Sequence, residues 1–269
     1  MTTDSSLSAP AAFVRRPSPH LVEGLVTHVE RSLDLDPELA HEQWEGYVGA
    51  LQQAGYAIVE LDPTPDLADG VFVEDSMVLV DELAVITAPG APSRRPETTT
   101  SRAAAVAAGL RVVDLSEAPV AGDVRLDGGD VLKVGRTAYV GVGGRTTAAG
   151  AAALAHHLNA VGWQVVVVPI AKTLHLKSQV TALPDGTVVG YRPLVDDSSL
   201  WPEFLEVPEP EGAHVVVLGE NTVLMADRAP RTADLYAERG LEVVTVSISE
   251  FIKLEGCVTC LSVRMHPAD

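Results

Sequence analysis

The sequence predicts an α/β fold in which units of strand, strand, helix and strand repeat along the chain and close into a ring. Short apolar runs bounded by turn residues alternate with Ala-rich segments of helical spacing, which indicates the repeat. The last strand-like run lacks a sequel, whereas the N-terminal part supplies a strand, a helix and a strand. Because joining the two ends into one unit leaves no exposed sheet edge, we expect a propeller-type ring and one domain over residues 1–269.

The first complete unit is the clearest. We expect strands over 71–80 and 83–87, a helix after Pro96 and a strand over 111–115. Gly109 stands just past this helix, where glycine is common because it adopts a left-handed backbone without strain. Gly109 therefore marks the expected end of the helix.

The next two units keep the order with less regular helices. In the second unit we expect a helix that Thr146 or Thr147 caps, with these bounds: strands 131–134, 137–141 and 163–168, helix 146–159. In the third unit a Pro184-Asp185-Gly186 turn joins strands 176–183 and 187–191, and a poorly defined helix follows near Pro202.

The last units complete the ring. The fourth is expected to contain strands 214–218, 222–226 and 242–246 and helix 232–239. The closing unit combines strands 259–265, 12–15 and 56–61 with helix 37–54. Residues 208–212 are the clearest linker candidate, but their charge and prolines more simply predict a surface turn.

The charge balance restricts the partners. The chain has 19 Lys+Arg against 37 Asp+Glu, a formal net charge of -18, which disfavours nucleic acids and anionic membranes and is compatible with a small cationic substrate. The apolar run 165–170 is far too short to span a bilayer, and residues 1–12 lack a basic start followed by an apolar block. We therefore expect a cytoplasmic protein without a membrane partner.

Unusual polar residues fall where the first strand of four units begins. These segments are 69–75, 127–130, 175–178 and 257–262. Equivalent positions of a ring face one another, so residues far apart in sequence are expected to meet at one end of the central channel. Rigidly held element ends of this kind commonly carry functional sites.

The two cysteines, Cys257 and Cys260, invite several interpretations. A chain of this length does not need one short disulfide for stability. Cys260 is compatible with a buried core cysteine, a metal ligand or redox partner of Cys257, or a nucleophile. A zinc site would need further ligands at suitable spacing, and redox pairs prefer a helix N-terminus, whereas this segment is predicted to be a loop entering a strand. The spacing by itself leaves the choice open.

His175 and Asp127 are each unremarkable when considered alone. The simplest interpretation of His175 is a histidine fixed by a backbone hydrogen bond, and that of Asp127 is part of an acidic hairpin turn. Together with Cys260, however, they supply the thiol, the base and the orienting carboxylate of an activated-thiol site. The coincidence of the three favours catalysis.

Charged residues near these positions suit a zwitterionic substrate that carries a guanidinium group. Arg94 and Arg145 occupy the same position in successive units, and fork-shaped guanidinium groups grip carboxylates well, although either is also compatible with a solvated loop. Asp69, Glu74 and Asp75 suit a group of the opposite charge, because carboxylates pair with a guanidinium. They are also compatible with a surface acidic patch.

Taken together, these segments resemble the dimethylarginine dimethylaminohydrolase family. The matching motifs occur in the family's order over most of the chain: Asp69-Gly-Val-Phe-Val-Glu74-Asp75, Ala91-Pro-Ser-Arg94-Arg95, Leu126-Asp127-Gly-Gly-Asp130-Val-Leu, Leu174-His175-Leu-Lys-Ser178 and Gly256-Cys-Val-Thr-Cys260-Leu-Ser-Val. The resemblance implies a five-bladed α/β propeller of ββαβ units in a pseudo-fivefold arrangement, with no required cofactor and no metal.

The resemblance also implies roles for the catalytic residues. Cys260 would attack the guanidinium carbon of an Nω-methylated arginine. His175 would protonate the departing alkylamine and then activate water against the thiouronium intermediate, and Asp127 would orient His175. The products would be citrulline and an alkylamine.

Substrate binding follows by the same resemblance. Asp69, Glu74 and Asp75 would hold the guanidinium, and Arg94 and Arg145 the α-carboxylate. Backbone carbonyls of Leu254 and of Leu25, within a lid-like segment at 17–25, would meet the α-amine. Glu255 stands where a smaller Asp is expected, and Cys257 has no assigned role.

Several alternatives stay open at the level of sequence. An arginine deiminase shares the nucleophilic logic but usually carries an additional helical insertion, for which 269 residues leave little room. An amidinotransferase would use an amine in place of water as acceptor. A non-enzymatic protein that binds an arginine derivative is the third alternative, and it would retain the pocket without turnover.

Overall fold

Five three-stranded sheets form the fold of this protein, shown by a computed structural model that describes residues 10–265. The sheets, each written in spatial order, are β15-β1-β2, β3-β4-β5, β6-β7-β8, β11-β10-β9 and β12-β13-β14. In every sheet the middle strand pairs antiparallel with the inner strand (β15, β3, β6, β9 or β12) and parallel with the outer strand (β2, β5, β8, β11 or β14). The repeat is thereby confirmed, because a parallel neighbour needs a crossover connection, and in four of the five units that connection contains an α-helix.

The bounds of the elements follow the predicted order. The strands are β1 (Ala11–Val14), β2 (Ala57–Glu60), β3 (Met77–Val80), β4 (Leu83–Ile86), β5 (Arg111–Asp114), β6 (Val131–Val134), β7 (Thr137–Val142), β8 (Gln164–Pro169), β9 (Val180–Ala182), β10 (Val188–Gly190), β11 (Phe204–Glu206), β12 (Val216–Gly219), β13 (Thr222–Ala226), β14 (Glu242–Val246) and β15 (Val263–Met265). The α-helices are α1 (Pro37–Gln53), α2 (Thr98–Ala107), α3 (Ala148–Asn159), α4 (Pro230–Glu238) and α5 (Ser249–Ile252).

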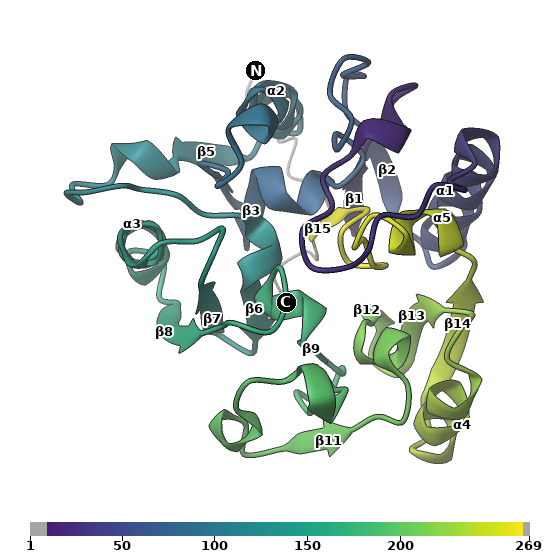
Figure 1. The fold of residues 1–269 in the computed structure, drawn as a ribbon. Helices are drawn as coiled ribbons and strands as arrows, with labels where there is room; N and C mark the ends of the chain where they lie inside the picture. The colour runs from purple at the N-terminus through teal and green to yellow at the C-terminus, as the bar shows by residue number, and fades with distance from the viewer. Residues whose placement is uncertain (1–9, 266–269) are drawn as a thin grey trace, which may run out of the picture.

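The sheets are arranged as a ring. In Figure 1 the first strands β3, β6, β9, β12 and β15 lie around the middle, and α1 to α4 lie on the outside. Neighbouring units meet through these first strands, since β15 contacts β3 and β6 contacts β9. The two ends of the chain join as predicted, with Ala11 opposite Met265 in the antiparallel β1–β15 pair.

Several first strands begin later than the sequence predicts. The one-turn 3-10 helices Val73–Ser76, Gly128–Asp130 and Leu176–Ser178 precede β3, β6 and β9, and residues 258–261 form a turn before β15. The predicted strands at 71–80, 176–183 and 259–265 were therefore too long. An apolar run does not distinguish such a turn from a strand, because side chains such as Val73 and Leu176 are buried in the turn just as strand residues are.

The helix predicted near Pro202 is wrong. Between β10 and β11 the described chain has two 3-10 helices, Arg192–Leu194 and Ser198–Leu200, and β11 follows directly. Pro193 and Pro202 lie in this connection, and proline interrupts the hydrogen-bond pattern of a helix. The candidate linker at 208–212 overlaps the 3-10 helix Pro210–Ala213, which leads into β12.

Local signals set the helix ends. Asp36 accepts hydrogen bonds from the backbone N–H of Glu38 at 2.9 Å and of Leu39 at 3.2 Å, and so caps α1. Thr147 caps α3 through the N–H of Gly150 at 3.0 Å, one of the two predicted capping residues. Gly109 follows α2 with φ +77°, the left-handed backbone expected there.

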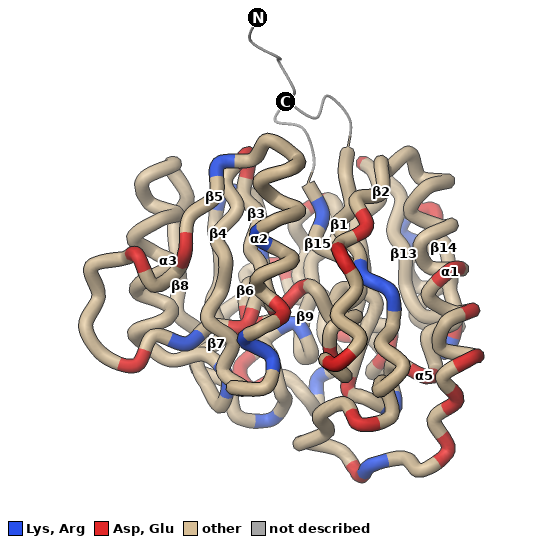
Figure 2. The backbone as a smooth tube through the Cα atoms, turned by 90° about the horizontal axis from the view of Figure 1, so that it is seen from above, with Lys and Arg blue, Asp and Glu red and all other residues tan. Residues whose placement is uncertain are grey.

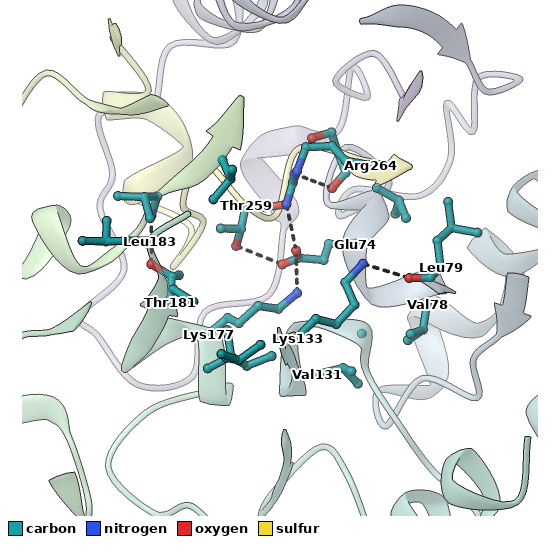
Figure 3. A pocket seen from close by; sticks show the side chains of 18 of the residues that line it. Glu74, Val78, Leu79, Val131, Lys133, Lys177, Thr181, Leu183, Thr259 and Arg264 are labelled. Carbon is teal, nitrogen blue, oxygen red and sulfur yellow. Dashed lines mark hydrogen bonds and ion pairs between the residues drawn. The ribbon is translucent and has the colours of Figure 1, made fainter. Parts of the chain in front are cut away.

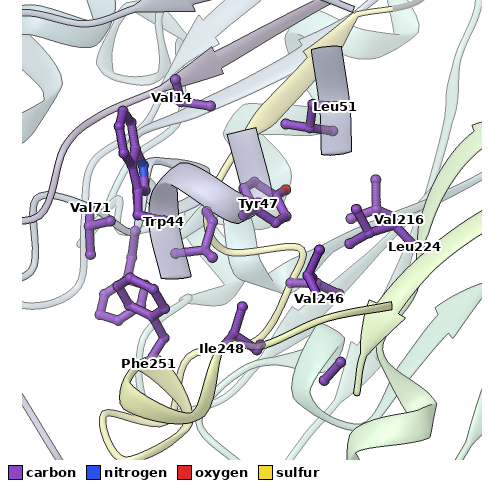
Figure 4. Packing of buried hydrophobic residues seen from close by; sticks show 14 of the residues in the cluster. Val14, Trp44, Tyr47, Leu51, Val71, Val216, Leu224, Val246, Ile248 and Phe251 are labelled. Carbon is purple, nitrogen blue, oxygen red and sulfur yellow. The ribbon is translucent and has the colours of Figure 1, made fainter. Parts of the chain in front are cut away.

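Helix α1 is held by one buried face. Trp44, Tyr47 and Leu51 recur at helical spacing in a cluster that also holds residues of β1, of the fourth unit and of α5, and Figure 4 shows them with Val246 of β14 and Phe251 of α5. Burying a large apolar side chain of this kind contributes roughly 1.5–3 kcal/mol. The same cluster contains Leu254, Val258 and Leu261, so it supports the loop that carries both cysteines.

Acidic residues are spread over the outer elements. Figure 2 shows Asp and Glu positions along α1 and the surface loops, with Lys and Arg scattered among them. Within the described residues, no helix has the length and apolar character needed to cross a membrane. Of residues 1–12, considered above for a targeting signal, the first nine lie outside the described part.

Candidate active site

The turns before the first strands bring the predicted polar residues together. The 3-10 helix Val73–Ser76 contacts Gly128–Asp130, which in turn contacts Leu176–Ser178. Asp75, Asp127 and His175 therefore meet, although 48 residues separate Asp127 from His175. The rigid inner strands that follow hold these turns in place.

The Asp-Gly-Gly-Asp motif owes its two glycines to close approach. A Cβ at position 128 would stand 2.0 Å from the backbone oxygen of Glu74, and one at position 129 would stand 2.6 Å from His175 Nδ1 and 2.7 Å from Asp75 Oδ1. Only the absence of a side chain lets the turn lie against the histidine. The motif is thus required by geometry as well as by chemistry.

Gly129→Ala is expected to lower kcat by at least about tenfold, because the added methyl group must displace His175 or Asp75 at a cost of roughly 1–3 kcal/mol. Steady-state citrulline formation checks this. Gly144→Ala is the matched control, since its Cβ meets no heavy atom within 4 Å. Equal losses in both variants would show that the close approach at Gly129 does not matter.

His175 and Asp127 form a buried pair. His175 Nε2 lies 3.0 Å from Asp127 Oδ2 and 3.8 Å from Asp75 Oδ1. Burial opposes the charge of His175, but the carboxylates of Asp75, Asp127 and Asp130 outweigh it and raise the pKa of His175 to about 9. Burial likewise opposes the charge of Asp127, yet the hydrogen bond and charge of His175 hold its pKa well below the usual range. At neutral pH the pair is therefore an ion pair with a protonated imidazole.

A small pocket opens beside this pair. Its lining includes eight of the ten predicted site residues: Leu25, Asp69, Asp75, Arg94, Arg145, His175, Leu254 and Cys260. Asp127 lies behind His175, fully buried. The open volume is about 20 Å³, room for little more than a water molecule, so an arginine derivative enters only when the surrounding segments move.

Cys260 carries its thiol into the pocket from the turn before β15. The side chain is half-buried, and its Sγ lies 3.3 Å from Cys257 Sγ. The hydrogen bond with Cys257, burial and the nearby carboxylates of Glu74 and Asp75 raise the pKa of Cys260 well above that of an ordinary thiol. The resting thiol is therefore protonated at neutral pH.

Arg94 is bound tightly into the protein. It is buried, and it forms ion pairs with Asp75 and, at 2.8 Å, with Glu97, and donates to the backbone oxygen of Phe72 at 2.9 Å. Burial opposes its charge, but Glu97 and Asp75 raise its pKa well above the usual value. Most of its donors are thus committed, and its clearest effect is to fix Asp75.

Arg145 is the freer of the two predicted arginines. Its side chain is 12% exposed against 5% for Arg94. Among the described residues it donates to one group, Asp127 Oδ2 at 3.2 Å. Arg145 is accordingly better placed to offer donors to a substrate carboxylate.

Glu74 does not join this pocket. Figure 3 shows it among the residues lining a second, larger cavity of about 320 Å³, on the other side of the turn. Its carboxylate pairs with Lys177 Nζ at 2.6 Å and accepts from Thr259 Oγ1 at 3.0 Å. These partners hold the Glu74 carboxylate at the second cavity, and its expected role in holding the guanidinium stays a prediction.

Asp130 and Thr146 support the site without having been singled out. Buried Asp130 accepts from the N–H of Leu176 at 2.9 Å and from Thr146 Oγ1 at 2.6 Å, and Thr146 Oγ1 also accepts from the N–H of Asp127 at 3.1 Å. Burial raises the pKa of Asp130 to about 6. These hydrogen bonds connect the turn of Asp127 to that of His175. In the sequence, the second aspartate of the Asp-Gly-Gly-Asp motif was the signal from which this supporting role could have been predicted.

Residues 17–31, called the lid segment here, contain the predicted lid 17–25 and contribute Leu25 to the lining of the pocket. The N–H of Leu25 donates to Asp69 Oδ1 at 2.9 Å, and Arg31 donates to the backbone oxygens of Val22 and Gly24. Glu255 accepts from the N–H of Thr27 at 2.8 Å. The same carboxylate accepts from the N–H of His28 at 2.6 Å. The longer side chain noted at position 255 is therefore the anchor of the lid.

Glu255→Ala is expected to raise KM for the substrate about tenfold with a smaller change in kcat, because two backbone donors lose their shared carboxylate and the closed lid loses roughly 1.4 kcal/mol. Initial rates over a substrate range check this. Glu220→Ala, at an exposed turn residue, is the control. A fall in kcat at constant KM would assign Glu255 to the reaction rather than to the lid.

Three groups at the centre of the site have the types of a metal ligand set. One atom each of Asp75, Asp127 and His175 lies within 4.8 Å of the others. However, these carboxylates already accept from Arg94 and Arg145, whose charges oppose a divalent cation. The donor set therefore suits a hydrogen-bonded proton-transfer site better than a metal.

Comparisons with known proteins agree with this arrangement. The sequence model of the arginine deiminase family matches residues 28–207. A protein of Streptomyces coelicolor named N(G),N(G)-dimethylarginine dimethylaminohydrolase is 56% identical over 255 residues, which cover 95% of this chain and 96% of the relative.

Two solved structures match at 30% identity and cover 95% of this chain. One is a dimethylarginine dimethylaminohydrolase variant as an adduct with S-methyl-L-thiocitrulline, with a TM-score of 0.84 over 99% of that chain. The other is a cysteine-to-serine variant of the Pseudomonas aeruginosa enzyme complexed with citrulline, with a TM-score of 0.83 over 98% of that chain. The chain therefore belongs to the dimethylarginine dimethylaminohydrolase family, within the pentein superfamily.

Proposed function

We propose that this protein hydrolyses Nω-methylated arginine to citrulline and an alkylamine, with Cys260 as the covalent nucleophile. The observation that carries the proposal is the pocket whose lining gathers Cys260 and His175 with the carboxylates of Asp69 and Asp75 and the guanidinium of Arg145. Such a pocket matches a substrate with a guanidinium at one end and an α-carboxylate elsewhere. Asp69 and Asp75 hold the guanidinium, and Arg145 receives the α-carboxylate.

The reaction follows from these positions. The Cys260 thiolate forms a bond to the guanidinium carbon, and the C–N bond to the alkylamine breaks as His175 gives its proton to the departing nitrogen. Water, deprotonated by His175, then attacks the thiouronium carbon, and the C–S bond breaks to release citrulline and the thiolate. Asp127 holds Nε2 of His175 throughout and so fixes the imidazole in the pocket.

The thiolate arises on substrate binding. The pKa of Cys260 is raised in the resting protein, whereas a cationic guanidinium beside the sulfur favours the ionised form. The positive charge of the bound substrate therefore generates the Cys260 thiolate only when a guanidinium carbon is present for it to attack.

Alkylation of Cys260 by iodoacetamide is accordingly expected to be slow in the unliganded protein at neutral pH and to keep accelerating as the pH rises through the alkaline range, since only the thiolate reacts and the pKa of Cys260 is raised above that of an ordinary thiol. Both cysteines lie between Lys253 and Arg264, so fragmentation of this peptide by tandem mass spectrometry separates the label on Cys260 from that on Cys257. A rate already at its plateau at neutral pH would contradict substrate-assisted ionisation.

The experiment that tests the function is citrulline and amine release from asymmetric dimethylarginine and, separately, from arginine. Release of dimethylamine from the methylated substrate supports the proposal. The match to the arginine deiminase model makes that activity the second candidate, and preference for arginine would favour it. Binding of either compound without turnover would favour a non-enzymatic protein that binds an arginine derivative.

The cytoplasm is the compartment that we propose. Cys257 and Cys260 are both free thiols, and the reducing environment of the cytosol keeps such cysteine pairs reduced. A thiolate nucleophile also needs this reduced state. Cell fractionation with an antibody against the chain tests the assignment.

A further inference from the structure

Cys257 is a buried thiol that the reaction does not use. Its Sγ lies 3.3 Å from the Sγ of Cys260, and the two residues belong to one turn, closed by the N–H of Cys260 donating to the backbone oxygen of Cys257 at 3.1 Å. Among the described residues these are the only cysteines. A nucleophile and a second thiol are therefore held in contact.

The contact is close to that of a disulfide. An S–S bond is about 2.05 Å long, so the two sulfur atoms, now 3.3 Å apart, need a further approach of about 1 Å to bond. The hydrogen bond from Cys260 lowers the pKa of Cys257 well below that of an ordinary thiol, so the pair gives up one proton more readily than an isolated thiol does. The turn thus offers an oxidant a thiolate with a resolving thiol beside it.

We propose that Cys257 and Cys260 form a peroxide-sensitive dithiol whose closure into a disulfide reversibly removes the nucleophile. The inference rests on the proposed role of Cys260. A thiolate of the pair attacks hydrogen peroxide, the O–O bond breaks, and a sulfenic acid and hydroxide form. The other thiol then attacks the sulfenic sulfur, the S–S bond forms and water leaves. In sum, two thiols and one peroxide give a disulfide and two water molecules.

Cys257 has a second effect in this scheme. A sulfenic acid without a neighbouring thiol proceeds to sulfinic acid, which dithiols do not reduce, whereas a disulfide is reopened by an external dithiol. Cys257 therefore protects Cys260 from irreversible loss.

The test treats the full chain and Cys257→Ala with the same excess of hydrogen peroxide, followed by dithiothreitol. Two readouts are taken at each step: tryptic peptide mass at the cysteines, and dimethylarginine turnover. In the native chain we expect peroxide to remove two hydrogen atoms from the peptide that contains both cysteines and to lower turnover at least about tenfold. Dithiothreitol should reverse both changes. In Cys257→Ala we expect oxygen addition at Cys260 and no recovery.

The mass readout does not depend on activity, so it decides even if Cys257→Ala turns over poorly. Sulfinic acid at Cys260 of the native chain without any disulfide would overturn the inference. A disulfide that forms while turnover persists would instead refute Cys260 as nucleophile, and with it the proposed function of this thiol. Loss of turnover without any change in mass at either cysteine would also overturn the inference.

Discussion

Cys260→Ser is expected to reduce citrulline formation from dimethylarginine by roughly 10⁴-fold or more, because a hydroxyl is far less acidic than a thiol and the covalent step is lost. The pocket itself should survive, since the two side chains are nearly equal in size. Product release by the variant, measured as citrulline and as dimethylamine, checks the prediction.

The matched control for this variant is Cys257→Ser, which alters the neighbouring thiol and keeps the nucleophile. It is expected to retain turnover within about tenfold of the native chain, a change of at most roughly 1.4 kcal/mol in the barrier. Comparable losses in both variants would point to damage of the turn rather than to loss of a nucleophile. Retention of most activity in Cys260→Ser would place the nucleophile elsewhere.

Asp127→Asn is expected to lower kcat by about 10²–10⁴-fold, by analogy with the orienting carboxylate of hydrolase triads. The amide offers Nε2 of His175 a neutral partner and removes one of the charges that keep the imidazole protonated. His175 then becomes a weaker candidate to protonate the leaving amine. The effect is therefore on the reaction and not only on the fold.

The dependence of kcat on pH separates an effect of Asp127→Asn on the reaction from an effect on the fold. In the native chain His175 is protonated below its pKa of about 9, so kcat is expected to fall as the pH rises through that value. In Asp127→Asn the falling limb should move to lower pH, although Asp75 still supports the charged form. Asp123→Asn, at an exposed aspartate paired with Arg125, is the control. An unshifted limb in Asp127→Asn would remove Asp127 from its positioning role.

Much of the architecture could be predicted because its signals are local. The alternation of apolar runs and turns predicted five units in the correct order, and the Thr147 cap and Gly109 marked helix ends. The prediction failed where local signals are ambiguous. A buried Val73 has the same sequence signature in a 3-10 turn as in a strand, and the prolines beside β11 did not reveal which alternative to a helix would form.

The candidate site was predictable in membership but not in orientation. Eight of the ten predicted residues line the pocket. Arg94 and Arg145 follow the second strands of their units, whereas Asp75, His175 and Cys260 precede the first strands of theirs, and the ring brings these starts together. Glu74 has the same kind of position, yet Lys177 and Thr259 draw its carboxylate into the second cavity. Likewise, the saturation of Arg94 by Asp75 and Glu97 depends on partners that no local pattern reveals.

By itself, then, the sequence determined the repeat, the ends of α2 and α3 and the set of chemical groups, since these depend on spacing and residue type within one unit. Only the tertiary structure decided that Glu74 pairs with Lys177, how Glu255 anchors the lid, and that Cys257 lies against Cys260. These contacts join residues of different segments or depend on side-chain direction. The direction of a side chain is set by all its neighbours in space, and the linear order of the chain does not specify them.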